Sequence, residues 1–294
     1  MIIASLVIDL NNNIKVSGLN EIPIPGNVVW DSLVEYINEL ANIALDSLTL
    51  LDLTNSPLLL VLSNTFFNIH TFETSDLKQI SQSDKQVQSK SPYLPANTLV
   101  DFLRISDKKI SNSKVRTIYA NRDFIKGWTD TLEIIDLPII GVVPAAPHIF
   151  DSITSKITEE ITVLLDIEST QTNLIIGSNL DRLTSHKLPF GSALYITNDL
   201  NESSKEYFER VTNSIKLIMN ENNEELPTNI FVMGSGLDGL VNIEEPLPKG
   251  FKRISDLNLA NYSYVPKKMQ IHEIISKTID SNVYSMASIL TSCV

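Results

Sequence analysis

Two aspartates of this 294-residue chain each lie near the end of an apolar run that is followed by a polar turn and a second apolar run. Asp9 belongs to LVIDLNNNIKV (residues 6–16), and Asp166 belongs to VLLDIESTQTNLII (residues 163–176). Apolar runs joined by a short polar turn are typical of β-hairpins. Carboxylate oxygens are hard ligands that suit Mg²⁺, so the two aspartates could orient a metal-bound water for phosphate chemistry. Lys15, in the first hairpin, could contact a phosphate or face solvent.

Each of these features also has a purely structural interpretation. An aspartate beside a hairpin turn can accept hydrogen bonds from the backbone N–H groups of that turn. Ser169 and Thr170 in the second turn are further candidates for nucleotide contact, as are Gly234 and Gly236 after a later apolar run. Glycines after a strand are also common in turns that bind nothing.

The composition predicts an ordinary soluble globular protein, with 43% hydrophobic and 20% charged residues. The net charge of −12 argues against a general nucleic-acid-binding protein. A single cysteine, Cys293, excludes an internal disulfide framework. The four histidines lack ligand spacing, so we predict no metal site and no catalytic residues. The N-terminus does not resemble a signal peptide, and no apolar run reaches the roughly 20 residues needed to cross a bilayer, so we expect no membrane anchor.

Strand-like and helix-like segments alternate along the chain, which predicts an α/β fold. The predicted helices are residues 30–51, 123–136, 147–157, 202–220 and 269–290, and residues 75–91 predict a loop or short helix. The predicted strands outside the two hairpins are residues 58–63, 66–72, 115–121, 139–144, 183–189 and 229–233. The length allows two lobes. We predict a first lobe at 1–160, with an inserted small α/β subdomain at about 66–144, and a second lobe at 161–294.

Taken in order, five segments resemble the PilM family, which are actin-like, FtsA-related cytoplasmic proteins of type IV pilus assembly. They are LVIDLNNNIKV, the YLP of residues 93–95 with the DF of residues 101–102, the helix leading into LPIIGVVP, VLLDIESTQTNLII with LPFGSALYIT, and IFVMGSGLDGL. The resemblance implies a two-lobed actin-like (ribonuclease H-like) fold, in which a nucleotide and its metal bind between the lobes and contact both hairpins.

The nucleotide-binding positions depart from the pattern of that family. The family has glycine two residues after each hairpin aspartate, where the backbone approaches phosphate and leaves no room for a Cβ atom. Asn11 and Glu168 occupy these positions here. Asn11 tolerates the left-handed backbone, whereas Glu168 directs a carboxylate toward the phosphate position. Ser192 and Ser235 also stand where the family has the second glycine of a pair. We therefore expect no cofactor and no enzymatic activity.

The function that this resemblance implies is a non-catalytic scaffold that binds partner subunits or a partner peptide in a large, type IV pilus-like assembly. The expected location is the cytoplasm, peripheral to a membrane-bound assembly. In the family, the inserted subdomain and its groove hold an extended peptide of an inner-membrane partner, so the matching region here is residues 66–144. Its candidate anchors are Phe66, Phe67, Tyr93, Phe102 and Tyr119. The negative net charge favours a partner segment that is basic around an apolar motif.

Two alternatives remain open at this stage. The first is an ATP-binding PilM-type protein, in which shifted turns accommodate Asn11 and Glu168 and ATP with Mg binds between the lobes. The second is a structural component of a virion or of another secretion-like assembly that uses the same fold. Neither alternative involves nucleic acid or direct membrane insertion.

Overall fold

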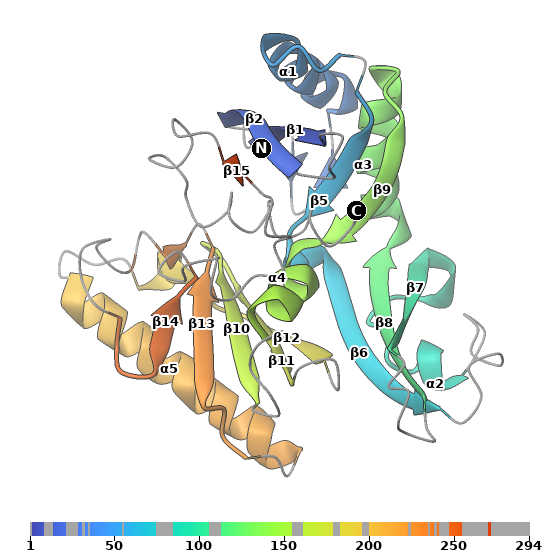
Figure 1. Cartoon of the computed structure of the whole chain (residues 1–294). Helices are drawn as coiled ribbons and strands as arrows, with labels where there is room; N and C mark the ends of the chain where they lie inside the picture. Colours follow the sequence, from blue (N-terminus) through green and yellow to red (C-terminus); the bar gives the residue numbers. More distant parts are fainter. Residues whose placement is uncertain are drawn as a thin grey trace.

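The computed structural model describes residues 2–8, 14–21, 29–30, 33–34, 36–54, 56–74, 85–105, 113–154, 161–178, 183–195, 200–222, 225–234, 236–237, 240, 247–254 and 270–271. Helices and strands alternate through most of these residues, which confirms the α/β class (Figure 1). No helix among them is both long enough and apolar enough to span a membrane.

The described part of the first lobe includes two small sheets with two neighbouring helices, and a short two-stranded pair described below. One sheet has the order β1-β2-β15, with β1 (Ile2–Ile8), β2 (Ile14–Glu21) and β15 (Gln270–Ile271). The other pairs β5 (Leu58–Leu62) with β9 (Ile139–Pro144) in parallel. Helix α1 (Ile37–Leu50) precedes β5, and helix α3 (Arg122–Ile134) precedes β9. The two helices pack against each other (Figure 1).

A three-stranded antiparallel sheet is inserted between β5 and β9. Its order is β6-β8-β7, with β6 (Phe67–Thr74), β7 (Thr98–Ile105) and β8 (Ser113–Asn121). The short helices near it are η1 (Asn64–Phe66), α2 (Lys85–Gln88) and η2 (Pro95–Asn97). Strand β9 pairs with β5 and not with this sheet, although the predicted insertion extends to residue 144. Strand β7 is absent from the predicted elements because Asp101 and Arg104 interrupt its apolar pattern.

The second lobe is a five-stranded sheet with a helix on each face. Its order is β12-β11-β10-β13-β14, with β10 (Thr162–Ile167), β11 (Thr172–Gly177), β12 (Leu183–Leu188), β13 (Asn229–Met233) and β14 (Phe251–Arg253). Helix α5 (Leu200–Glu221) covers one face and helix α4 (Ala145–Thr154) covers the other. Every residue of β10 and β11 is therefore buried.

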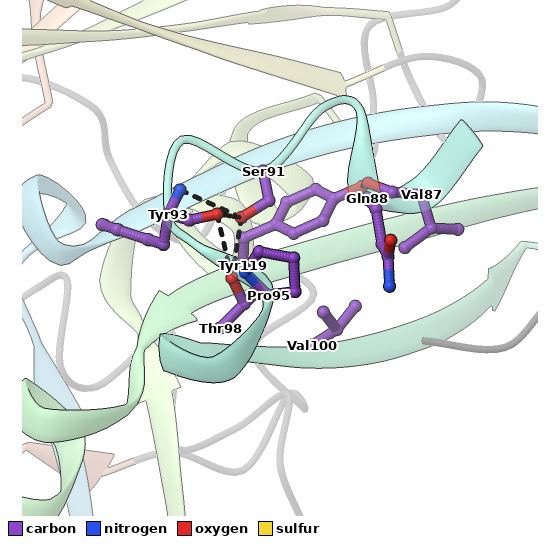
Figure 2. A pocket seen from close by; sticks show the side chains of 8 residues that line it. All are labelled: Val87, Gln88, Ser91, Tyr93, Pro95, Thr98, Val100 and Tyr119. Carbon is purple, nitrogen blue, oxygen red and sulfur yellow. Dashed lines mark hydrogen bonds between the residues drawn. The ribbon is translucent and has the colours of Figure 1, made fainter. Parts of the chain in front are cut away.

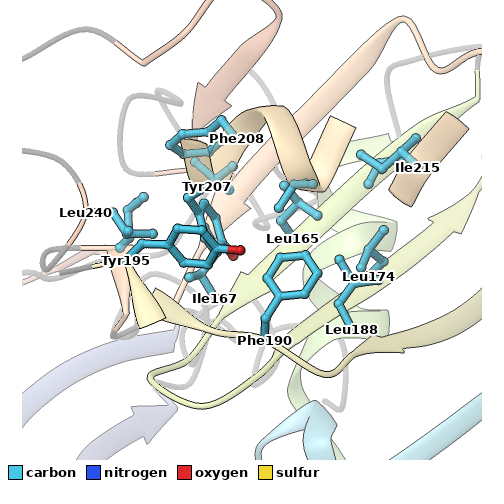
Figure 3. Close-up of a cluster of buried hydrophobic side chains, with 14 of the residues drawn as sticks. Leu165, Ile167, Leu174, Leu188, Phe190, Tyr195, Tyr207, Phe208, Ile215 and Leu240 are labelled. Atoms are coloured by element: carbon cyan, nitrogen blue, oxygen red, sulfur yellow. The ribbon is translucent and has the colours of Figure 1, made fainter. Parts of the chain in front are cut away.

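Alternating side chains of β10 and β11 supply the two cores. On the α5 face, Leu165 and Leu174 pack with Tyr207 and Ile215 (Figure 3). On the α4 face, the buried cluster contains Leu164, Ile175 and Phe231 of the sheet and Ile149 and Phe150 of α4. Burying each large apolar side chain contributes about 1.5–3 kcal/mol, which accounts for the continuous apolar runs of these strands.

The inserted sheet is fastened to the second lobe and to α4. Ile69 of β6 is part of the core on the α4 face, and its N–H donates to the Ser185 hydroxyl of β12 at 2.8 Å. The buried guanidinium of Arg116 donates to both oxygens of Asp151 on α4, at 2.7 and 3.1 Å. These contacts and the shared core fix the insertion against the rest of the protein.

Two of the predicted helices differ from the structure. The helix predicted at 30–51 starts at Ile37, because two short antiparallel strands precede it, β3 (Val29–Trp30) and β4 (Leu33–Val34). The aromatic and β-branched residues of β3 and β4 favour strands. The apolar residues of these strands were wrongly counted as the first turns of the helix. The helix predicted at 269–290 lies outside the described residues except at Gln270–Ile271, which form β15. Its predicted start is therefore wrong.

Candidate functional site

The second predicted hairpin is formed by β10 and β11. Asp166 and Asn173 face each other in the antiparallel ladder, and the Glu168 N–H donates to the Gln171 carbonyl at 3.0 Å to close the turn. Ser169 and Thr170 are exposed at its tip. In the first hairpin, Lys15 lies on β2 opposite Val7 of β1.

Asp9 and Asn11 lie outside the described residues. The hairpin predicted around them is present as the antiparallel pair β1 and β2. The site can therefore be built only from the second hairpin and from the parts of the first lobe that reach it.

The carboxylate of Glu168 is bonded to the loop that follows β5. The hydroxyls of Ser63 and Thr65 both donate to it, the second at 2.9 Å, and the Gln171 amide donates to the same oxygen as Thr65 at 3.4 Å. The Thr65 hydroxyl also accepts from the amides of Gln171 at 2.8 Å and Asn173 at 3.1 Å. We call residues 63–65 the clasp loop, because they join the first lobe to the second hairpin.

Asp166 is held by the middle residue of the clasp loop. The side-chain amide of Asn64 donates to Asp166 at 2.8 Å, and its carbonyl accepts the N–H of Ala146 at 2.6 Å. The Ala146 bond fixes the orientation of the amide, so that its NH₂ group points at Asp166. Asp166 itself is only 5% exposed.

The pKa of Asp166 is raised from 3.8 to about 7, mainly by burial and also by the nearby negative charge of Glu168, while the hydrogen bond from Asn64 opposes the shift. A carboxyl with this pKa is partly protonated at neutral pH. Such a group is a weaker metal ligand than a free carboxylate, because metal binding requires the deprotonated form.

Gly234 and Gly236, the two glycines predicted as nucleotide contacts, and also Gly191 lie close to the hairpin backbone. Gly234 has φ +107°, and a Cβ atom there would lie 2.2 Å from the Ile167 carbonyl oxygen. The Gly236 N–H donates to that same carbonyl at 2.8 Å. A Cβ atom on Gly191 would lie 2.3 Å from the Glu168 carbonyl oxygen. These three glycines therefore have a structural requirement that is independent of any ligand.

The chemistry available at this site is limited. Within the described part of the chain, no group of three or more histidine, cysteine, aspartate or glutamate side chains could hold a metal ion. Asp166 and Glu168 are the two acidic side chains of the hairpin end, and both accept hydrogen bonds from the clasp loop. Phosphate is disfavoured beside Glu168 because like charges repel strongly where water is partly excluded.

The predicted partner anchors do not form one exposed surface. Phe67 and Tyr119 are buried, with exposed fractions of 3% and 0%, so the proposal of these two residues as surface anchors is wrong. Phe66 stacks on Phe124, with ring centroids 3.7 Å apart. The Tyr93 hydroxyl donates to the Phe66 carbonyl at 3.3 Å. Phe102 is half-buried on β7.

Tyr93 and Tyr119 line a small pocket against the inserted sheet, together with Val87 and Pro95 (Figure 2). Its volume of about 30 Å³ has space for little more than one water molecule. The Tyr119 hydroxyl is already satisfied by the Val87 carbonyl, to which it donates at 2.9 Å. This pocket is therefore too small to take an aromatic or aliphatic side chain of a partner.

The sequence reading missed the residues that hold Glu168 and Asp166. Ser63, Thr65 and Gln171 donate to Glu168, and Asn64 donates to Asp166. Asn173 and Lys187 in turn donate to Thr65, at its hydroxyl and its carbonyl. One signal was available in the sequence, because the polar SNT follows directly after the apolar LLLVL. Nothing in the spacing connects this loop to a hairpin about 100 residues away.

Comparison with known proteins gives a fold but no family. No protein-family model matches the chain, and no curated protein matches it. A chain of the PilM–PilN type IV pilus biogenesis complex superimposes with a TM-score of 0.62 and 14% identity, covering 99% of this chain and 93% of that one.

Two further structures give weaker superpositions. A Bacteroides thetaiotaomicron protein with an actin-like ATPase fold gives a TM-score of 0.44 at 8% identity, covering 95% and 88% of the two chains. The cytoplasmic domain of EpsL, from the type II secretion system of Vibrio cholerae, gives a TM-score of 0.40 at 10% identity, covering 97% of this chain and 88% of that one. The superposition on the PilM–PilN chain confirms the predicted resemblance at the level of the fold, and the chain has the predicted two-lobed actin-like fold with an inserted subdomain.

Proposed function

We propose that this protein is a non-catalytic actin-like scaffold that binds a partner subunit in a multi-subunit assembly of the pilus or secretion kind. The carrying observation is the bonding of Glu168 to Ser63 and Thr65, at the hairpin turn where an actin-like protein would approach phosphate. The fold shared with a chain of the PilM–PilN complex supports the assembly role. The proposed location is the cytoplasm, beside a membrane-bound assembly.

The clasp loop supplies what a nucleotide would otherwise supply. An actin-like cleft normally closes around its nucleotide, so a protein without one needs direct contacts to hold its lobes. Hydrogen bonds from residues 63–65 to residues 166 and 168 are such contacts. A phosphate entering here would displace them and meet the Glu168 charge, a repulsion on the order of several kcal/mol at reduced dielectric.

Calorimetric titration of the protein with ATP and Mg²⁺ tests the absence of a nucleotide site. We expect no saturable heat at micromolar to millimolar ATP. A matched titration uses the double variant Glu168→Gly, Asn11→Gly, in which recovered binding identifies these two residues as the obstruction. A micromolar dissociation constant for the unchanged protein overturns the proposal and restores the ATP-binding alternative.

Partner binding at the inserted subdomain is tested with alanine variants of Tyr93 and Phe102, compared with the unchanged protein in pull-downs from the native source. Circular dichroism controls for loss of fold. If both variants still capture the main partner and Asp166→Ala does not, the binding surface is at the hairpin site and not at the inserted subdomain.

A further inference from the structure

Helices α1 and α3 end in the same way. α1 runs into Leu50-Leu51-Asp52-Leu53, and α3 runs into Ile134-Ile135-Asp136-Leu137. Asp52 has φ 57° and Asp136 has φ 53°, and they are the two non-glycine residues with positive φ among the residues that the structure describes. The N–H of each aspartate donates to the carbonyl three residues earlier, at 3.1 and 3.0 Å.

The two helix ends lie at one edge of the first lobe. α1 leads into β5 and α3 leads into β9, and these parallel strands are paired from their first residues, Leu58 with Ile139. The Leu58 N–H also donates to the Pro138 carbonyl at 2.9 Å. Both helix-to-strand connections therefore meet at the same edge, at the upper end of the molecule in Figure 1.

Aspartate is an uncommon choice at both positions. The left-handed conformation at a helix end is usually taken by glycine, and less often by asparagine or aspartate. A carboxylate at a helix C-terminus also faces the negative end of the helix dipole, where basic residues are stabilising. Neither helix has a basic residue in its last turn. Neither backbone geometry nor helix electrostatics accounts for the choice of aspartate over asparagine.

Aliphatic side chains are exposed at this same edge. Leu50 is 79% exposed and Ile134 is 53% exposed, and they occupy equivalent places before the two aspartates. Ile140 is 68% exposed and is the extra residue of a β-bulge, since Leu58 pairs with Ile139 but Leu59 pairs with Gly141. Bulges commonly turn a side chain away from the regular pattern of the sheet. Single exposed aliphatic residues are ordinary, but here three of them lie at the same edge of the first lobe.

The two chain segments that meet at this edge carry no basic residue. No lysine or arginine occurs in residues 16–77 or 127–155, which contain both helix ends and the strands they lead into. Asp46, Asp52, Glu133 and Asp136 are exposed on or beside the last turns of the two helices. The two helix ends therefore bring exposed aliphatic and acidic side chains to the same edge.

We propose that this edge, defined by Leu50, Asp52, Ile134, Asp136 and Ile140, docks a basic amphipathic segment of the partner subunit. The proposal rests on the scaffold function proposed above and places the partner at a surface that the sequence reading did not select. A second copy of this chain is a poorer occupant, because each copy carries a net charge of −12 and would bring its own acidic surface. A basic, apolar segment complements both properties of the edge.

The test uses a defined probe, a synthetic amphipathic helical peptide of about 18 residues made of leucine and lysine, with a leucine and glutamate peptide of the same pattern as its control. Fluorescence anisotropy measures the dissociation constant. The variant is Asp52→Asn, Asp136→Asn, and its matched control is Glu206→Gln, Glu209→Gln on the exposed face of α5, which changes net charge equally.

We expect the lysine peptide to bind the unchanged protein and the glutamate peptide not to bind. The aspartate variant should bind about tenfold more weakly, while the α5 control stays within about twofold of the unchanged protein. The melting temperature of the aspartate variant should stay equal or rise, because asparagine suits the left-handed position better and removes negative charge from the helix ends. An equal loss in both double variants would mean attraction by net charge alone and would overturn the proposal.

The apolar part of the edge is tested separately with Leu50→Ser and Ile140→Ser, against Leu217→Ser on α5 as the exposed control (64%). The proposal is supported if the first two variants bind the peptide more weakly and Leu217→Ser binds it as tightly as the unchanged protein does. Sedimentation velocity that shows a dimer of the unchanged protein, lost in Leu50→Ser, would assign the edge to a second copy instead. Failure of the peptide to bind, with ATP also not bound, would overturn this docking edge and leave the proposed scaffold function standing.

Discussion

The Thr65 hydroxyl donates a hydrogen bond of 2.9 Å to the carboxylate of Glu168, which lies 103 positions later in the chain. This bond joins the clasp loop of the first lobe to the hairpin turn of the second. It occupies a carboxylate oxygen at a position where the actin-like pattern requires glycine. The residue that we propose to exclude phosphate thus also contributes a contact between the lobes.

Removing the hydroxyls of the clasp loop should destabilise the protein. Ser63→Ala with Thr65→Val leaves Glu168 without two of its donors, and we expect the free energy of unfolding to fall by about 3–6 kcal/mol, since hydrogen bonds to charged groups are worth about 1.5–3 kcal/mol each. Urea unfolding measures the change. The control is Ser214→Ala with Thr212→Val, whose hydroxyls bond within α5. Similar losses in both pairs would show that the clasp loop adds nothing specific.

Asp166 should make the stability depend on pH. Its pKa is about 7 in the folded protein and 3.8 in the reference state, so the folded state binds the proton more tightly. The stabilisation from this proton is complete below the unfolded value and is lost as the pH rises through about 7. Asp166→Asn cannot ionise and keeps an acceptor for Asn64, so it should gain stability relative to the unchanged protein between pH 5 and pH 8.

We expect that relative gain to be of the order of 1–3 kcal/mol, since one pKa unit corresponds to about 1.4 kcal/mol. Urea unfolding across the pH range measures it. Glu209→Gln, at an exposed position of α5, is the control for a lost surface carboxylate. A stability difference between Asp166→Asn and the unchanged protein that stays constant with pH would contradict the raised pKa.

Gly234 and Gly250 offer a matched pair of substitutions. Both have positive φ, +107° and +99°, but a Cβ atom on Gly250 meets nothing within 4 Å. Gly250→Ala should therefore lose only about 1–2 kcal/mol, the cost of the left-handed backbone. Gly234→Ala also places its Cβ atom 2.2 Å from the Ile167 carbonyl oxygen and should lose more than about 4 kcal/mol or fail to fold. Thermal unfolding compares them, and equal losses would refute the close contact.

The lobes should keep their arrangement whether or not nucleotide is added. Ile69, Phe150 and Leu164 belong to one core that joins the insertion, α4 and the second lobe, in addition to the clasp loop. Small-angle scattering curves with and without ATP and Mg²⁺ should superimpose. A change in the radius of gyration on adding ATP would mean that the lobes close around a ligand.

The α/β class, both hairpins and most of the helices could be predicted from the amino-acid pattern alone. The reason is that burial on two faces requires continuous apolar strands such as VLLDI, and a helix with one buried face requires the period seen in residues 202–220. The sequence also indicated that Glu168 places a carboxylate where glycine would be needed, because this depends only on residue type and position in a turn.

The contacts of Glu168, the burial of the aromatic residues and the start of α1 depend on how distant segments pack, so they could not be predicted from the sequence. Ser63 and Thr65 meet Glu168 because the lobes pack together, and Phe67 and Tyr119 are buried because the inserted sheet is covered. The repeat of Leu50–Asp52 at Ile134–Asp136 is visible in the sequence, but its meaning depends on the pairing of β5 with β9, which brings both helix ends to one edge. Local patterns determine elements, whereas contacts between distant segments arise only when those elements pack.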